Sequence, residues 1–193
     1  MSQTRDDTTE IRIDPERTNV VPLDRDAVDL VARARHENLS RPAYWGDSLD
    51  HDRTGVTAEA AVATRYGLPT PTPGDPSGDG GVDYLVDHAG RTERWDVKGT
   101  TYADPSLMVP ETYVGPADAY VLVTRHVTPE GALFGILQGF ARAERLVREA
   151  NRTPSKDREA FHYELSNEAL GPVPDVDAVR PVADARDEEA DRS

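Results

Sequence analysis

The chain has 193 residues and 37% hydrophobic content, which allows one domain with a sizeable core but indicates that part of the length is not packed. It contains no cysteine, so disulfide scaffolds and thiolate metal sites are excluded. No apolar run is long enough to span a bilayer, and the N-terminus lacks a secretory pattern. We therefore expect a soluble cytoplasmic protein with no membrane partner.

The chain begins with a polar stretch that is followed by two helices. Residues 1–20 are charged and show no periodicity, which predicts a disordered arm. Apolar residues at helical spacing predict a helix over 24–38, which Asp24 can cap. A second helix is predicted over 54–66, with Gly67 placed to end it.

Glu59 lies on the second predicted helix, on the same stripe as Val56 and Ala63. An acid on an inward-facing stripe is expected to be paired or bound to a metal, because a buried charge is otherwise unfavourable. Glu59 is therefore a candidate site residue. The alternative is a first-turn glutamate that the helix dipole favours.

A β-hairpin is predicted over 82–100, after a loop rich in proline, glycine and aspartate. Its two β-prone runs are joined by a polar link in which Gly90 can supply a positive φ. A symmetric register about Ala89 and Gly90 sets three pairs of residues opposite each other. These are Val82 with Val97, Asp83 with Asp96, and Tyr84 with Trp95.

The predicted hairpin has one apolar and one charged face. Side chains alternate along a strand, so Asp83, Asp96 and Lys98 are expected to share the charged face. Two close carboxylates repel unless one is protonated or a cation lies between them, and their oxygen atoms suit a hard ion such as Mg²⁺. Lys98 could then stabilise charge on a phosphate or orient an attacking water. The alternative is a solvated face whose acids pair with Lys98 and Arg94.

The rest of the chain predicts further strands and one helix. An irregular segment is expected first, and apolar runs then predict two buried strands and an edge strand. In chain order these are 103–118 (irregular), 119–124, 133–137 and 161–165. A helix is predicted over 140–150.

The helix predicted over 140–150 carries Arg142, Arg145 and Arg148 on its outer side. These arginines are candidates for contacts to a nucleic-acid backbone. Glu144 and Glu149 also allow an ordinary solvated face, and that alternative stays open.

The order of the predicted elements indicates the fold class. Two helices, a hairpin, two strands and a helix predict an α/β domain with a central mixed β-sheet flanked by helices. We expect a single domain over 21–172. Prolines and acids dominate beyond it, so 173–193 are predicted to form an acidic disordered tail.

The hairpin resembles the PD-(D/E)xK nuclease superfamily. Asp83 matches the first acid, Asp96-Val97-Lys98 matches the D-x-K element, and Val82 stands where the family name has proline. The resemblance covers the chain from the helix of Glu59 to the helix ending near 150. It implies a restriction endonuclease-like core. In this superfamily a helix before the hairpin often supplies a further glutamate, and Glu59 matches that place.

The resemblance implies a metal-dependent endonuclease that hydrolyses phosphodiester bonds of DNA. Asp83, Asp96 and Glu59 would bind Mg²⁺ (or Mn²⁺), and Lys98 would position water or stabilise the transition state. A homodimer remains open. One competing hypothesis is a non-catalytic module that retains the fold and binds nucleic acid or protein. Another is an unrelated acidic domain whose acids lie in solvated turns.

The charge balance is unusual for a protein that binds nucleic acid, with 36 acidic against 22 basic residues and a net charge of −14. Lys98 and Lys156 are the only lysines. This composition resembles that of proteins adapted to high intracellular salt. Molar salt shortens the Debye length to about 3 Å, so overall repulsion from DNA would matter little there. The alternative is an ordinary acidic protein that never meets DNA.

The halophilic hypothesis predicts that solubility and activity both rise with KCl concentration. The reason is that salt screens the repulsion among the excess carboxylates. Solubility and activity measured across a KCl series test it. Full activity at low salt would contradict it.

Overall fold

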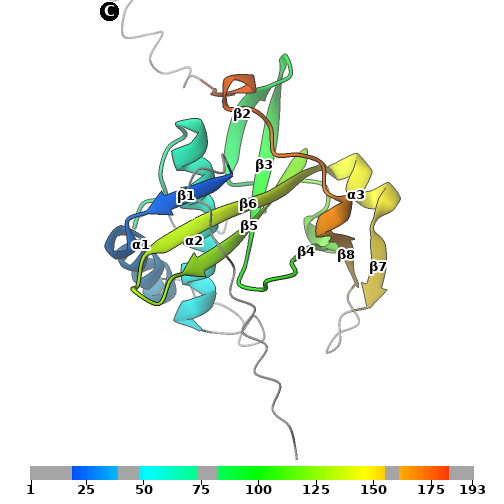
Figure 1. Cartoon of the computed structure of the whole chain (residues 1–193). Coiled ribbons are helices and arrows are strands. Elements are labelled where there is room, and N and C mark those ends of the chain that lie inside the picture. Colours follow the sequence, from blue (N-terminus) through cyan, green and yellow to red (C-terminus); the bar gives the residue numbers. More distant parts are fainter. Residues whose placement is uncertain (1–18, 39–47, 74–81, 155–160, 183–193) are drawn as a thin grey trace, which may run out of the picture.

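The computed structural model describes residues 19–38, 48–73, 82–154 and 161–182. These described residues form three α-helices, α1 (Arg25–Asn38), α2 (Leu49–Tyr66) and α3 (Ala143–Glu149). The strands are β1 (Val20–Leu23), β2 (Tyr84–His88), β3 (Arg91–Thr100), β4 (Ser106–Pro110), β5 (Ala119–Val127), β6 (Leu133–Arg142), β7 (Asn151–Pro154), β8 (Phe161–Ser166) and β9 (Val179–Pro181) (Figure 1). Short 3₁₀ turns lie at Glu111–Tyr113, Asn167–Ala169 and Val176–Ala178.

A curled, mixed six-stranded sheet forms the centre of the fold. Its strand order is β1-β6-β5-β3-β2-β9, in which β3 and β5 run parallel and every other neighbouring pair is antiparallel. A second, three-stranded antiparallel sheet has the order β4-β8-β7. The predicted α/β class with a mixed central sheet is therefore confirmed.

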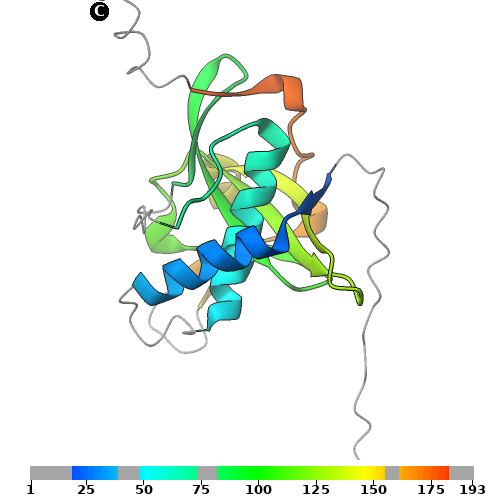
Figure 2. The same cartoon turned by 90° about the vertical axis from the view of Figure 1, so that its left-hand side faces the viewer.

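Helix α2 packs on one face of the large sheet, and α1 crosses α2 on the same side (Figure 2). Buried side chains of α2, among them Val62 and Tyr66, join Trp95, Val121 and Leu137 of the strands in one apolar core. Two glycines allow this close approach. A Cβ at Gly99 would lie 2.6 Å from the backbone oxygen of Thr54, and a Cβ at Gly135 would overlap that of Ala61.

The opposite face of the large sheet is covered by the small sheet and α3. Leu107, Leu165 and Leu146 pack there against Tyr120 and Leu122 of β5. The helices predicted to flank the sheet thus lie mainly on one face, because the segment predicted to be irregular supplies β4 to the other.

The helix and strand predictions agree with the structure at several boundaries. Helix α1 occupies the predicted segment, and Gly67 ends α2 with a φ of 64°. Helix α2 begins earlier than predicted because the Ser48 side chain accepts a hydrogen bond from the backbone N–H of His51. The predicted buried strands are present as β5 and β6. The strand predicted over 161–165 is present as β8, but it is not an edge strand, because it lies between β4 and β7 in the small sheet.

The predicted boundaries of the domain were too narrow at both ends. Val20, assigned to the arm, pairs with Ile136 in β1, whereas residues 1–18 of that arm lie outside the described residues. The segment after 172, assigned to the tail, contributes β9, which pairs with β2. Val179 is buried there, and the Tyr66 hydroxyl donates to the backbone oxygen of Pro174. Burial against distant partners outweighs the polar composition of this segment.

Two further predictions were wrong. The segment 103–118 is not irregular throughout, because β4 pairs with β8. The helix predicted over 140–150 begins only at Ala143, because β6 continues through Arg142, which pairs with Ala119 of β5. In both cases the pairing partner is distant in sequence.

Replacement of Gly135 by alanine tests the close packing of α2 on the sheet. The added Cβ would overlap Ala61, so we expect Gly135→Ala to lower the free energy of unfolding by about 1–3 kcal/mol. The control is Gly55→Ala on α2 itself, where a Cβ meets open space and should raise stability by about 0.5–1 kcal/mol. Urea unfolding at one KCl concentration measures both. Equal stabilities of Gly135→Ala and the wild type would contradict the packing.

Candidate functional site

The β2–β3 hairpin turns through Ala89 and Gly90, which both have positive φ (53° and 77°). This geometry is typical of the tight two-residue turn whose twist matches the strands. The predicted register is confirmed where Tyr84 pairs with Trp95. The apolar face is confirmed as well, because Tyr84, Trp95 and Val97 all belong to the core beneath α2.

Asp83 lies directly before β2 and departs from the predicted pairing. Its backbone N–H donates to the backbone oxygen of Trp95 at 2.8 Å. Trp95 is also the register partner of Tyr84, so Asp83 and Tyr84 both lie opposite this one residue. Its carboxylate Oδ2 accepts from the backbone N–H of Val97 at 2.6 Å. The N–H of Val97, which the predicted register set opposite Val82, is thus bonded to the side chain of Asp83 instead. This bond holds the Asp83 carboxylate against β3, beside the residue that separates Asp96 from Lys98.

Asp96 and Lys98 lie on the other face of β3, where their register partners on β5 are Tyr120 and Leu122. The ammonium of Lys98 lies 2.6 Å from Oδ2 of Asp96. The Asp96 side chain is only 4% exposed, whereas that of Lys98 is 28% exposed and also lies over the ring of Tyr113, 5.9 Å from its centroid. The pair therefore joins a buried acid to an amine that solvent can reach.

The electrostatic effect of Asp96 is visible at Tyr120. Burial, and then the negative charges of Asp96 and Asp118, raise the pKa of the Tyr120 phenol to about 12. Its hydroxyl remains protonated and donates to the backbone oxygen of Tyr113 at 3.0 Å. This bond ties the 3₁₀ turn that carries Tyr113 to the strand beside the Asp96–Lys98 pair.

Glu59 has a different environment. Both of its carboxylate oxygens accept from Arg35 of α1, at 2.6 and 2.5 Å, so the predicted inward-facing acid is paired with an arginine. Its backbone oxygen accepts from the Tyr84 hydroxyl at 3.0 Å. Burial, followed by the charges of Glu59 and Asp83, raises the pKa of Tyr84 well above its ordinary value. Glu59 therefore lies near the start of β2, but its carboxylate anchors α1.

The structure brings the four predicted site residues together only in part. Asp96 and Lys98 form an ion pair, and Asp83 is bonded to the residue between them. Glu59 is paired elsewhere. Among the described residues, no group of three histidine, aspartate or glutamate side chains is placed to hold a metal ion. Of the three predicted metal ligands, only Asp83 and Asp96 lie near Lys98, and Mg²⁺ is commonly bound by one or two carboxylates alongside water and substrate phosphates.

A second charged group, centred on Glu93, was not predicted. Glu93 is 1% exposed, and its Oε2 lies 3.0 Å from both Nδ1 of His88 and Nε1 of Trp95. Its Oε1 accepts from Nε of Arg91 at 2.7 Å and from Nη1 of Arg142. Burial alone would raise the pKa of Glu93, but the bonds from His88, Trp95 and Arg91 outweigh it and hold that pKa below the usual value.

The predicted hairpin register already contained the signal for this buried acid. Glu93 has the same parity as Trp95 and Val97, so it had to lie on the apolar face. Arg142, predicted to face outward from a helix, instead ends β6 and reaches Glu93. Arg145 and Arg148 both contact Glu149, which agrees with the alternative of a solvated face for those two arginines.

Comparison of the chain with protein-family models, with curated proteins and with solved structures finds no match. Within the described part of the chain, no helix has the length and apolar character needed to cross a membrane.

The pKa shift of Glu93 predicts how stability depends on pH. Because its pKa is lower in the folded than in the unfolded chain, its contribution is complete above the ordinary glutamate pKa of about 4.3 and is lost as pH falls through the folded value. We expect wild type to exceed Glu93→Gln in free energy of unfolding near pH 7. The difference should shrink below about pH 4. Denaturant unfolding between pH 3.5 and 7 measures it, and a constant difference would contradict the assignment.

Proposed function

We propose that this chain is a metal-dependent nuclease that hydrolyses phosphodiester bonds of DNA, with a restriction endonuclease-like core. The observation that supports the proposal most strongly is the Asp96–Lys98 pair, with the Asp83 carboxylate fixed to the residue between them. A partly exposed amine joined to a buried acid is the combination expected of a group that acts on a phosphate. Arginine would not replace it, because its fork-shaped cation is wider and does not adjust its pKa.

The carboxylates of Asp83 and Asp96 would hold Mg²⁺ or Mn²⁺. Both belong to the hairpin, and the hydrogen bond from Val97 restricts the position of Asp83. Such an ion supplies Lewis-acid polarisation of a phosphoryl oxygen and a more acidic bound water. Hard oxygen donors and the absence of cysteine from the chain are both consistent with this choice of ion.

Lys98 would act directly on the substrate. Its ammonium is a compact charge whose exposed side can contact a phosphate oxygen or orient the attacking water. The ion pair with Asp96 holds it in place before substrate binds. Tyr113, beside the ammonium, limits the directions from which solvent approaches it.

One observation favours the competing hypothesis of a non-catalytic module that binds nucleic acid or protein. Glu59, expected to be the third acid, is held in a bidentate ion pair by Arg35. A site with only two carboxylates could retain the geometry of an ancestral nuclease without its activity. A cytoplasmic location and a homodimer are further proposals, and the geometry of the hairpin supports neither of them.

Replacement of Lys98 tests the nuclease proposal. In high KCl with Mg²⁺ or Mn²⁺, we expect the wild type to cleave DNA and Lys98→Ala to be about 100-fold slower or more, because the charge that stabilises the transition state is removed. Lys156→Ala, at the only other lysine, should cleave like the wild type. Equal activity of Lys98→Ala and the wild type would remove the proposed site. DNA binding without cleavage by the wild type would favour the non-catalytic module.

A second pair of variants tests Glu59. If Glu59 also reaches the metal ion, Glu59→Gln lowers the cleavage rate, whereas Arg35→Gln breaks the same ion pair and leaves the rate unchanged. Thermal unfolding of both variants controls for loss of the α1 anchor. Equal effects of the two substitutions on cleavage would restrict Glu59 to holding α1.

A further inference from the structure

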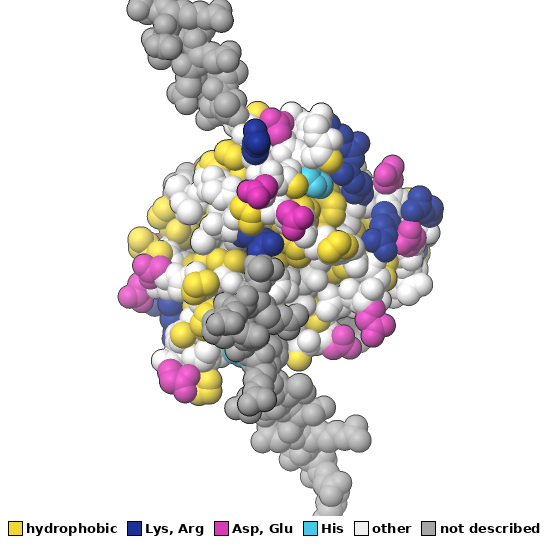
Figure 3. Space-filling model, turned by 45° about the horizontal axis from the view of Figure 1, so that its top comes forward, with side chains coloured by type: hydrophobic (Ala, Val, Ile, Leu, Met, Phe, Trp, Pro, Cys, Tyr) yellow, Lys and Arg dark blue, Asp and Glu magenta, His cyan; other side chains and the backbone are white. Residues whose placement is uncertain are grey.

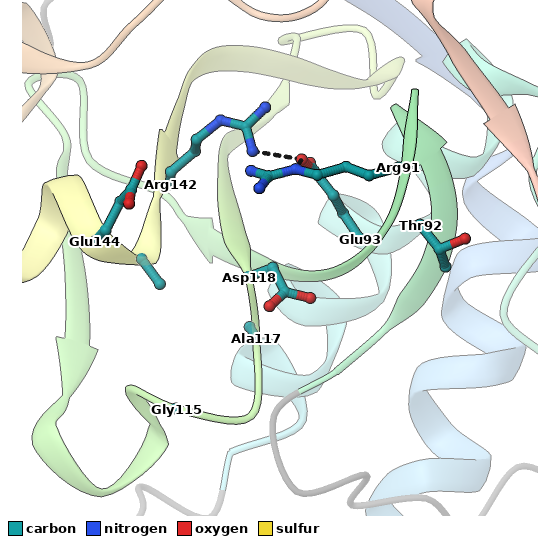
Figure 4. A pocket seen from close by; sticks show the side chains of 9 residues that line it. Arg91, Thr92, Glu93, Gly115, Ala117, Asp118, Arg142 and Glu144 are labelled. Atoms are coloured by element: carbon teal, nitrogen blue, oxygen red, sulfur yellow. Dashed lines mark hydrogen bonds and ion pairs between the residues drawn. The ribbon is translucent and has the colours of Figure 1, made fainter. Parts of the chain in front are cut away.

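A pocket of about 340 Å³ opens beside Glu93, between the start of β3, the start of β5 and the end of β6. Arg91 and Arg142 enter it from β3 and β6, and Gly115 and Asp118 lie on its other side (Figure 4). Its volume is at the small end of the range typical of ligand sites. Glu59, Asp83, Asp96 and Lys98 do not line it.

Glu93 orients the two arginines but is itself inaccessible to a ligand. Its four contacts, with Arg91, Arg142, His88 and Trp95, match the roughly four acceptor positions of a carboxylate. The aromatic rings around it restrict its movement further, because the His88 ring packs edge-on against Trp95, with centroids 5.5 Å apart. Glu93 is therefore a rigid, buried anchor.

The arginines, in contrast, remain partly exposed. The side chain of Arg91 is 58% exposed and that of Arg142 is 26% exposed. Each guanidinium has five N–H donors and gives one of them to Oε1 of Glu93. Most N–H donors of each arginine are therefore left to face the pocket. Two guanidinium groups on one carboxylate also leave an excess of one positive charge.

The two other acids at this pocket, Asp118 and Glu144, offset that excess only in part. Both oxygens of Asp118 accept from Arg94, at 3.0 Å each, so its charge is paired. Glu144 lies on the exposed rim, where water and salt screen it. Lys and Arg side chains gather toward the α3 side of the molecule in Figure 3, and the pocket borders α3 at Ala143 and Glu144.

We propose that Arg91 and Arg142, held by Glu93, form a binding site for a phosphate group. Two forks that converge from different strands match the several oxygens of one phosphate, which guanidinium groups bind by paired hydrogen bonds. The phosphate belongs either to a terminal phosphate, as in inorganic phosphate or a mononucleotide, or to the backbone of a polynucleotide. The site does not depend on whether the hairpin cleaves DNA.

Binding measurements without divalent metal test this site. The probes are inorganic phosphate, AMP and a labelled single-stranded 12-mer, at one KCl concentration at which circular dichroism shows the protein folded. We expect the wild type to bind at least one probe, and Arg91→Gln and Arg142→Gln each to weaken that binding about tenfold or more, because each removes charged hydrogen bonds. Arg152→Gln is the matched control. Arg152 lies in the small sheet, where it donates two hydrogen bonds to the carboxylate of Glu111.

The three probes distinguish the source of the phosphate. Binding of inorganic phosphate and AMP but not of the 12-mer indicates a terminal phosphate, whereas preference for the 12-mer indicates a polynucleotide backbone. Arg91→Gln retains Glu59, Asp83, Asp96 and Lys98, so weaker binding by this variant separates this site from the hairpin site. Arg142→Gln leaves Glu93 short of a partner and could lower stability, so the loss must also appear in the more exposed Arg91→Gln. No binding by the wild type, or unchanged binding by Arg91→Gln, would overturn the proposal.

Discussion

The alternation of side chains along β3 is the constraint on which both charged groups of this molecule depend. Strand β3 lies between β2 and β5, so each of its residues is committed to one face of the sheet. Glu93, Trp95 and Val97 face the core beneath α2, whereas Asp96 and Lys98 face the side covered by the small sheet. A shift of one residue in the register would exchange the two sets and bury the lysine in the apolar core.

Short-range features of the hairpin could be predicted from sequence because they follow from the turn. The turn at Ala89 and Gly90 defines the pairing of Tyr84 with Trp95, and alternation then defines the faces. The bond from Val97 to the Asp83 carboxylate could not be predicted, since it replaces a regular strand pairing by a side-chain contact. The place of Asp96 and Lys98 was thus predictable, but that of Asp83 only approximately.

Contacts between distant segments account for the predictions that were wrong or incomplete. The pairing of Glu59 with Arg35 depends on how α1 crosses α2, which no local pattern specifies. Strands β4 and β9 are five and three residues long and gain their order from β8 and β2. Strand β9 is too short to be indicated by its own sequence, and the short apolar run of β4 lies between Pro105 and Pro110, which argue against a strand. The contact of Arg142 with Glu93 is also one between distant segments, because it spans 49 residues of sequence.

Many arginines of the described residues are paired with a carboxylate, although the chain has a net charge of −14. Among the described residues, several carboxylates each accept from one arginine, namely Asp29, Asp50, Glu59, Glu111 and Asp118. Glu93 and Glu149 depart from this pattern, because each accepts from two arginines. Glu149 is exposed, whereas Glu93 is buried beside a pocket. The two arginines on Glu93 are therefore more informative about function than the two on Glu149.

The central proposal, that two aspartates of one hairpin bind a divalent ion beside Lys98, is tested most directly by anomalous diffraction from crystals grown with Mn²⁺. We predict an anomalous peak bonded to carboxylate oxygens of both Asp83 and Asp96, and its loss in crystals of Asp83→Asn. A Mn²⁺ peak elsewhere in the molecule, with no peak between these two aspartates, would contradict the proposed metal site.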